Sequence, residues 1–114
     1  SEIDFLKSKR KILVFGDMLE LGNFSKEMHI EIAAFINESD VDLVFCIGSE
    51  IKNLWDNLIL SKRGYHSIDP EILISSLKNK LKENDLVLIK GSSKSGIKII
   101  FNALMEEQLN RNIA

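Results

Sequence analysis

The sequence has little of several things, and each shortage excludes a class of protein. The chain of 114 residues has a single cysteine, Cys46, so it cannot form a disulfide within itself. Cys46 lies in an apolar run, which favours a buried, unreactive thiol. No apolar run approaches the roughly 20 residues that span a bilayer, and the charged start SEIDFLKSKRK lacks the apolar segment of a signal peptide. We therefore expect a cytoplasmic protein with no membrane span.

An excess of charge of either sign is also absent. The 15 basic and 17 acidic residues give a formal net charge of -2. The sequence thus indicates no general field that would attract polyanions, and we expect no nucleic-acid partner. No cluster of His, Cys, Asp and Glu has the spacing of metal ligands, so we expect no metal site within this chain.

Three short apolar runs indicate β-strands, and none of them alternates with polar residues. Continuous runs of this kind are typical of strands buried on both faces of a parallel sheet. A weaker fourth candidate covers residues 65–68. The three runs cover residues 12–15, 43–47 and 86–89, and they end at Gly16, Gly48 and Gly91.

Segments with helical spacing of apolar residues lie between these runs. Ser25 is expected to cap the first helix, and Asp69-Pro70-Glu71 has the residues of a helix start. The alternation of strands and helices predicts an α/β fold of three layers, with a mainly parallel sheet of about four to five strands and helices on both faces. The inner faces that we expect for the helices are Met28, Ile32, Phe35 and Ile36; Ile51, Leu54, Trp55, Leu58 and Ile59; Leu73, Ile74, Leu77 and Leu81; and Ile97, Ile100, Phe101, Leu104 and Met105.

Ligands of parallel α/β sheets bind beyond the carboxyl ends of the strands. Here these ends are Gly16-Asp17, Gly48-Ser49 and Lys90-Gly91-Ser92. The sequence motifs of known phosphate-binding loops do not match these strand ends. A dinucleotide fingerprint from Gly16 needs a glycine where the chain has Met18, and the glycine pair 91 and 96 is followed by Ile-Lys instead of the Lys-Ser/Thr of a P-loop. A receiver-type phosphoacceptor fails as well, because Gly48-Ser49 offers no aspartate.

Several polar residues keep more than one interpretation. The loop GSSKSG, residues 91–96, either binds an anion through its backbone N–H groups or caps the helix that follows. Lys90 either points towards a phosphate or a carboxylate or reaches solvent. On local grounds His29 is favoured as a polar surface residue of a first helical turn, and His66 as a residue without a special role.

The segment GDMLELG, residues 16–22, follows an apolar strand and precedes Ser25 and His29. This arrangement closely resembles the C-terminal domain of the Mur ligases. Within that family it is most similar to the branch that adds D-alanyl-D-alanine to UDP-MurNAc-tripeptide during peptidoglycan synthesis. The late strand that ends in Lys90-Gly91-Ser92 supports the resemblance, which covers essentially the whole chain.

The resemblance implies an enzyme of three domains. The first holds the UDP-sugar, the central one is a P-loop ATPase that uses ATP and Mg²⁺, and the third is a Rossmann-like domain that closes over the ATP and seats the dipeptide. Residues 1–114 are then this third domain without its first strand, with no catalytic residue and no bound cofactor of its own. The residues that the resemblance places at nucleotide or substrate are Gly16, Asp17, Glu20, Ser25, His29, Lys90, Gly91 and Ser92.

The resemblance also bears on the loop after the first strand. Its three large apolar residues are expected to pack it onto the domain, while Asp17 and Glu20 either face the cleft or only fix the loop through backbone N–H groups. The arginine that the family has after lysine-glycine-serine is replaced here by Ser93, with Lys94 next to it. The alternative to a ligase domain is a stand-alone, non-catalytic α/β module that binds a nucleotide or a protein partner.

Overall fold

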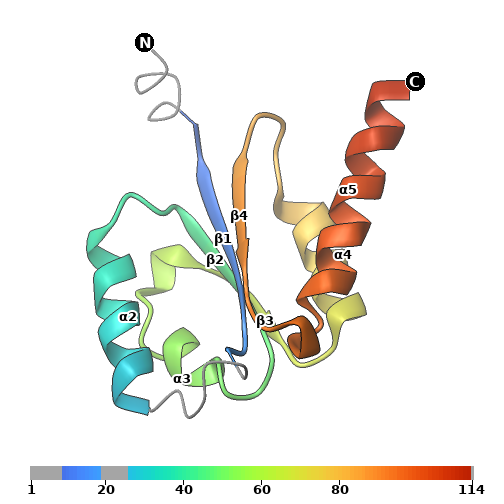
Figure 1. Ribbon diagram of the computed structural model, residues 1–114. Coiled ribbons are helices and arrows are strands. Elements are labelled where there is room, and N and C mark those ends of the chain that lie inside the picture. The colour runs from blue at the N-terminus through green and yellow to red at the C-terminus, as the bar shows by residue number, and fades with distance from the viewer. Residues whose placement is uncertain (1–8, 19–25, 114) are drawn as a thin grey trace.

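A four-stranded sheet lies between two helical layers in the computed structural model, which describes residues 9–18 and 26–113, with side chains as far as residue 109 (Figure 1). The strands follow the order β3-β2-β1-β4, and every pairing is parallel. Their bounds are β1 Lys11–Gly16, β2 Leu43–Ile47, β3 Arg63–Ser67 and β4 Leu86–Lys90. The predicted α/β class and parallel sheet are confirmed.

Helices cover both faces of this sheet, as predicted (Figure 1). One face carries α2, Lys26–Glu38, and the one-turn α3, Lys52–Trp55; the other carries α4, Pro70–Lys80, and α5, Ile97–Ile113. Two 3₁₀ turns, η2 Leu60–Lys62 and η3 Ser93–Ser95, precede β3 and α5. The carboxylate of Asp69 caps α4 by accepting from the N–H of Glu71 at 2.9 Å. Within residues 9–18 and 26–113, no helix is long and apolar enough to cross a membrane.

The sheet separates two apolar cores. Cys46 is buried in the core under α2 and α3, where burial and then the charge of Asp17 raise the pKa of its thiol, so the thiol is inert at neutral pH. The core under α4 and α5 contains Ile12, Val14, Phe45, Ile47, Leu73, Ile74, Leu77, Ile97 and Ile100. The core under α2 and α3 contains Leu13, Ala33, Ile36, Val44, Cys46, Ile51, Leu54 and Leu58.

The buried face of α2 differs from the predicted one. His29, Ala33 and Ile36 are buried, whereas Met28 is 43% and Phe35 77% exposed. The prediction is confirmed for Ile36, which is buried, and for Ile32, which packs against the core. It was wrong for Met28 and Phe35 because it favoured the largest apolar side chains. The helix instead turns the small Ala33 towards the sheet, and a small residue at the contact lets a helix pack closely. His29, expected on the surface, is carried inside with it.

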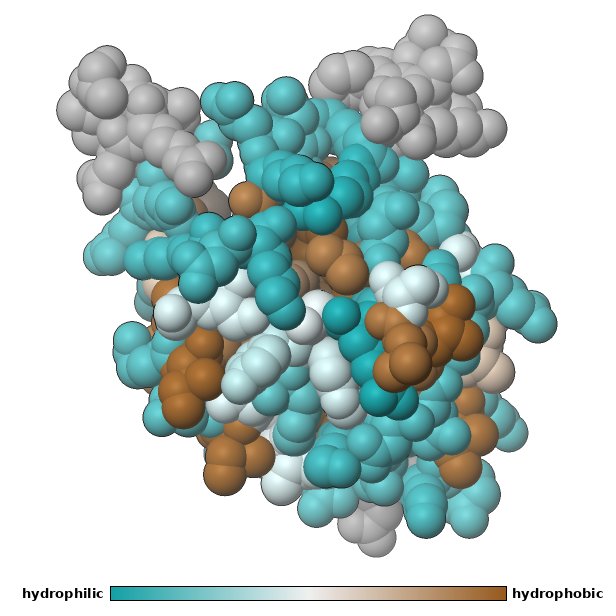
Figure 2. Space-filling model, turned by 180° about the vertical axis from the view of Figure 1, so that it is seen from behind, coloured by the Kyte–Doolittle hydropathy of each residue, from teal (hydrophilic) through white to brown (hydrophobic). Residues whose placement is uncertain are grey.

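Three further predictions of burial were wrong. Phe101 and Met105 of α5 are about half exposed, and Ile59 lies beyond the end of the short α3 and is exposed. β4 is not buried on both faces: Leu86 is exposed and Leu88 is 60% exposed, because α2 and α3 cover β1 and β2 but not the edge strand. On the face shown in Figure 2, exposed hydrophobic side chains form separate groups among hydrophilic ones.

An ion pair ties the starts of β1 and β4 together. Nη2 and Nε of Arg10 donate to the two carboxylate oxygens of Asp85 at 2.7 and 3.0 Å. Burial alone would raise the pKa of Asp85, but the hydrogen bonds from Arg10 and from the N–H of Lys82 outweigh it, so the pKa is lowered. This pair lies at the amino ends of the strands, opposite the end where ligands bind in such folds.

Candidate functional site

The strand order defines where a ligand would sit. From β1 the chain proceeds to β2 and β3 on one side, and then returns to place β4 on the other side of β1. Where the connections that follow two adjacent strands run in opposite directions, a crevice opens at the carboxyl ends of those strands. This is the usual ligand position in open α/β sheets. Here β1 and β4 flank that point, so the structure brings Gly16 and Asp17 together with Gly91 and Ser92.

Asp17 joins three strand ends at this crevice. Its N–H donates to the carbonyl of Ile47 at 3.2 Å, and its carbonyl accepts from the N–H of Ser92 at 2.8 Å. Its side chain is buried, and Oδ1 accepts from the N–H of Ile51 at 2.7 Å, with the N–H of Glu50 at 3.4 Å from Oδ2. The carboxylate therefore holds the turn that opens α3. This role was not predicted, because the sequence suggested that Asp17 either faces the cleft or fixes its own loop.

Two glycines are required by close approach at this end of the sheet. Gly48 has a φ of +122°, which residues other than glycine rarely adopt. A Cβ at this position would collide with the carboxylate of Asp17. A Cβ on Gly91 would lie 3.0 Å from the Cα of Gly16. The ends of β1 and β4 are therefore packed backbone against backbone.

In the loop GSSKSG, Ser92 and Ser95 form hydrogen bonds within the loop itself. Oγ of Ser92 accepts from the N–H of Lys94 at 3.3 Å, and Oγ of Ser95 donates to the carbonyl of Ser92 at 2.6 Å. The N–H of Ser95 donates to the same carbonyl at 3.0 Å. These bonds build the turn η3, and Gly96 in the left-handed region leads into α5. Self-capping, one of the two interpretations of this loop, is thus present.

Lys90 is exposed and lies on the face of the sheet opposite α5. Successive side chains of a strand point to opposite faces, and Val87 and Ile89 pack into the core under α4 and α5. Lys90 pairs in register with Phe15, whose side chain packs against the core under α2 and α3. The ammonium group therefore extends from the carboxyl end of β4 on the uncovered side of that strand.

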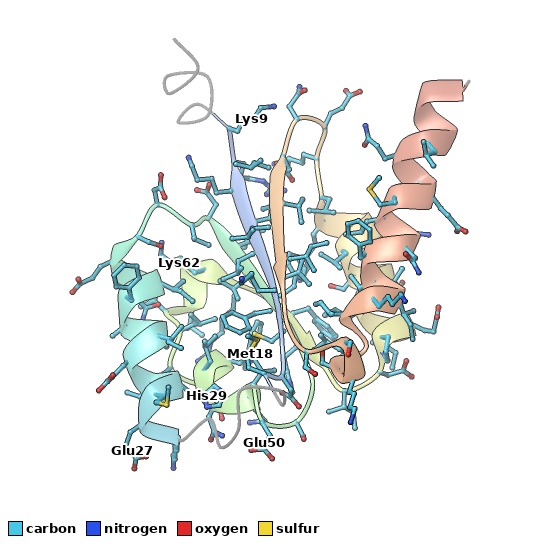
Figure 3. All side chains as sticks on the ribbon, viewed as in Figure 1. Lys9, Met18, Glu27, His29, Glu50 and Lys62 are labelled. Atoms are coloured by element: carbon cyan, nitrogen blue, oxygen red, sulfur yellow. The ribbon has the colours of Figure 1, made fainter. Side chains whose placement is uncertain are left out.

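His29 reaches the same end of the molecule from α2. Figure 3 shows His29, Met18 and Glu50 at the end where the strands finish, with His29 directed from α2 towards the sheet. Met18 is half-buried and Glu50 is exposed. His29 itself is fully buried, so its ring is not exposed at the surface of the molecule.

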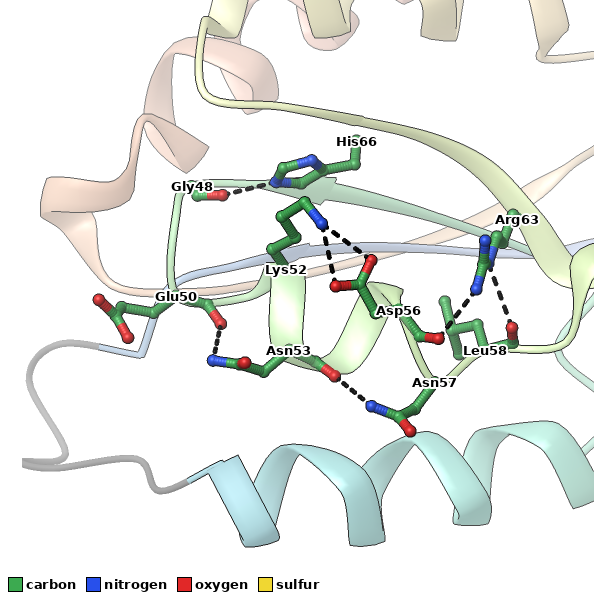
Figure 4. Close-up of polar contacts among 9 residues, drawn as sticks. All are labelled: Gly48, Glu50, Lys52, Asn53, Asp56, Asn57, Leu58, Arg63 and His66. Atoms are coloured by element: carbon green, nitrogen blue, oxygen red, sulfur yellow. Dashed lines mark hydrogen bonds and ion pairs between the residues drawn. The ribbon is translucent and has the colours of Figure 1, made fainter.

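A polar network around α3 was not predicted from the sequence. His66 Nε2 donates to the carbonyl of Gly48 at 2.7 Å (Figure 4). The centroid of its ring lies 6.1 Å from that of Trp55. Asn53 donates to the carbonyl of Glu50 at 3.1 Å. Nη2 of Arg63 donates to the carbonyl of Asp56 at 2.9 Å, at the other end of α3. His66 thus orients the end of β2, although it was expected to have no special role. Its partner lies 18 positions away, beyond the reach of local pattern.

Two predicted site residues, Glu20 and Ser25, lie outside the residues that the structure describes. Of the others, Gly16, Asp17, Gly91 and Ser92 form one cluster, Lys90 borders it, and His29 approaches it from α2. In the described ranges no group of three or more His, Cys, Asp and Glu side chains could hold a metal ion.

Sequence comparison identifies relatives of this chain. The family model described as "Mur ligase, glutamate ligase domain" matches residues 2–93. The UDP-N-acetylmuramoyl-tripeptide--D-alanyl-D-alanine ligase of Buchnera aphidicola subsp. Baizongia pistaciae is 35% identical over 99 residues, which are 85% of this chain and 21% of the relative. The enzyme of that name from Bacillus subtilis is 30% identical over 104 residues, 89% of this chain and 23% of the relative. The chain spans about a fifth of the length of the curated relatives it matches.

Structural comparison leads to the same group. The fold is similar to that of the MurF ligase from Thermotoga maritima, whose crystal structure is a complex with ADP, with a TM-score of 0.70 and 28% sequence identity. The match covers 90% of this chain and 23% of the ligase.

Proposed function

The chain belongs to the Mur ligase family, and from this premise we propose that it is the C-terminal domain of an ATP-dependent ligase that joins D-alanyl-D-alanine to UDP-MurNAc-tripeptide. In this proposal residues 1–114 close over ATP and seat the dipeptide. The first strand of the family domain, the UDP-binding domain and the central ATPase domain all lie outside these residues. The full enzyme works in the cytoplasm.

The observation that supports this function most is the cluster at the strand-order reversal. Two segments that resemble the family, GDMLELG and Lys90-Gly91-Ser92, lie about 70 positions apart in the sequence. The fold places Gly16 and Asp17 beside Gly91 and Ser92, with a hydrogen bond of 2.8 Å between the N–H of Ser92 and the carbonyl of Asp17. A domain that closes on a ligand needs a rigid edge of this kind, because a preorganised surface loses less entropy on binding.

Each residue of the cluster has a proposed task. Asp17 positions the ends of β1, β2 and β4. The backbone at Gly91 and Ser92 holds the end of β4 against that of β1, and Lys90 offers a positive charge to a phosphate or to the dipeptide carboxylate when the domain closes. The described residues supply no ligand set for Mg²⁺, so in this proposal both Mg²⁺ and the P-loop belong to the central domain.

In the proposed reaction ATP phosphorylates the carboxylate of the tripeptide. The amine of D-alanyl-D-alanine then attacks the acyl phosphate, and phosphate leaves as the amide bond forms. This chain contributes to positioning in that sequence and to neither bond change. The stand-alone module is not favoured, because the relatives are ligases in which this sequence is only a part.

A chimera tests the proposal. In the Bacillus subtilis relative, the segment that matches this chain is replaced by residues 1–114, and phosphate release from ATP is measured with UDP-MurNAc-tripeptide present. We expect release that depends on D-alanyl-D-alanine, and none from residues 1–114 alone or from the relative without the segment. A chimera that is folded and binds ATP, but shows no release with the dipeptide, contradicts the proposal if restoring the original segment restores activity.

A further inference from the structure

The loop between β2 and α3, residues 48–51, borders the crevice on the β2 side of β1. It lies directly against Asp17, whose N–H donates to the carbonyl of Ile47 at the end of β2 at 3.2 Å. Ser49 and Glu50 are exposed in this loop. The loop leads into α3, which covers the face of the sheet on which Lys90 extends. Loop 48–51 and Lys90 therefore flank the end of β1 on one face.

Neighbours on both sides hold loop 48–51. From the β1 side, the carboxylate of Asp17 accepts from the N–H of Ile51 at 2.7 Å. From β3, the carbonyl of Ser67 accepts from the N–H of Gly48 at 3.0 Å. Nε2 of His66, also in β3, donates to the carbonyl of Gly48 at 2.7 Å (Figure 4). The backbone of the loop is thus fixed by side chains that lie 34 and 18 positions away in the sequence.

Gly48 sets the direction of this loop. A glycine has no Cβ to restrict its backbone dihedrals, so the orientation of the next residue, Ser49, depends on the two hydrogen bonds that Gly48 makes with β3. Because a carbonyl oxygen can only accept, Nε2 of His66 carries the hydrogen in this contact. The ring of His66 is half-buried beside Trp55. It therefore holds the Gly48 carbonyl from a packed position.

We propose that His66 is a positioning residue for the dipeptide, which acts through Gly48 on Ser49, and that the hydroxyl group of Ser49 contacts the dipeptide. This inference rests on the proposed ligase function. A serine hydroxyl donates to an uncharged carbonyl oxygen, and the peptide carbonyl of D-alanyl-D-alanine is such an acceptor. A phosphate does not suit this place, because the carboxylates of Asp17 and Glu50 belong to the same edge and repel anions.

The other end of the dipeptide fits Lys90. β2 and β4 lie on the two sides of β1, so their ends are about 10 Å apart, which is two strand spacings. An extended dipeptide is at most about 7 Å long, and the long side chain of Lys90 covers the remaining distance. The dipeptide carboxylate then lies at the ammonium group of Lys90 and the peptide carbonyl at Ser49. The two contacts orient the dipeptide across the end of β1.

Steady-state kinetics of the chimera test the role of His66, with D-alanyl-D-alanine as the varied substrate. His66→Leu keeps an apolar side chain beside Trp55 but removes the donor. We expect it to raise the KM for the dipeptide about two- to tenfold, the factor that one neutral hydrogen bond is worth, while kcat and the KM for ATP stay unchanged. His66→Gln retains an N–H group at the end of its side chain and should restore most of the loss.

Ser49→Ala should raise the same KM by a similar factor. Combining it with His66→Leu should add little, because both changes act on one contact. Ser61→Ala is the matched control, because Ser61 is an exposed serine of η2, away from the carboxyl ends of the strands. It should leave every constant unchanged.

Three results overturn the inference. The first is a KM for the dipeptide that stays at the parent value in both His66→Leu and Ser49→Ala. The second is a rise in the KM for ATP instead, which would place the nucleotide at Ser49. The third is a His66→Gln variant as impaired as His66→Leu, because the donor would then not be the cause. An inactive parent chimera counts against the proposed ligase function, and this inference falls with it. An active parent with unaffected variants overturns the inference alone.

Discussion

Removing the carboxylate of Asp17 should loosen the strand ends rather than only a ligand contact. In Asp17→Ala the N–H of Ile51, now bonded at 2.7 Å, loses its acceptor in a buried position. A buried N–H without a partner costs about 1–3 kcal/mol. The bond from Glu50 at 3.4 Å is long and adds little. We expect a loss of about 1–3 kcal/mol in the free energy of unfolding.

Urea denaturation of the 114-residue chain measures this loss, and amide hydrogen exchange locates it at the N–H of Ile51. Asp17→Asn keeps one acceptor oxygen and should lose only about 1 kcal/mol. Asp56→Ala is the control on the same short helix, because Asp56 is exposed and its pair with Lys52 at 2.9 Å is of the kind worth at most about 0.5 kcal/mol.

An Asp17→Ala variant within 0.5 kcal/mol of the parent, with unchanged exchange at Ile51, would refute the positioning role, since about 1 kcal/mol is the least that the buried bond predicts. If that variant still lost dipeptide-dependent activity in the chimera, Asp17 would instead be a direct ligand contact.

Three further changes test other parts of the structure. Gly48→Ala should destabilise the chain by about 2 kcal/mol or more in urea denaturation, because it adds a Cβ at φ +122° against the Asp17 carboxylate; an unchanged midpoint would mean that the strand end is loosely packed. Folded Asp85 has a pKa below its ordinary value of 3.8, so its pair with Arg10 stabilises the fold above that pH and is lost as the pH falls further. Asp85→Asn should therefore cost about 1–2 kcal/mol at pH 7 and progressively less below pH 4, and a gap that stays constant with pH argues against the pair. Lys90→Met in the chimera should weaken ATP or dipeptide use by about 1–3 kcal/mol while the melting temperature stays the same; wild-type kinetics would make Lys90 an ordinary surface residue.

Element order and strand ends could be predicted from the sequence because they depend on local signals. The strands β1, β2 and β4 are short apolar runs that stop at or next to a glycine, and Asp69-Pro70 marks the start of α4 through its own side chain and ring. The polar β3 lacks this signal. Placing Gly16 and Gly91 at one crevice followed from the rule that parallel strands share a carboxyl edge. The residues nearest the backbone of the site were therefore within reach of pattern alone.

The contact partners of individual side chains could not be predicted from the sequence pattern. The acceptor role of Asp17 depends on Ile51, 34 positions away, and only the packed fold brings them together. Which face of α2 is buried could not be predicted, because hydrophobicity favours Phe35 for the interior while close packing selects Ala33. Exposure of Leu88 depends on strand order: the same apolar run in the middle of the sheet would be buried. In each case a local preference was overruled by a distant neighbour.

The central position of β1 also has a consequence for synthesis. Its two neighbours are made at very different times: β2 follows within a few tens of residues, but Arg10 and Asp85 are 75 positions apart. Until residues 86–113 leave the ribosome, Ile12 and Val14 lack the strand beside them and part of the helical layer above them. Long-range pairings of this kind close slowly, and nascent chains with uncovered apolar surface are open to aggregation and to chaperones. Acquisition of protease resistance during translation should therefore come late, when α5 emerges and the core beneath it closes.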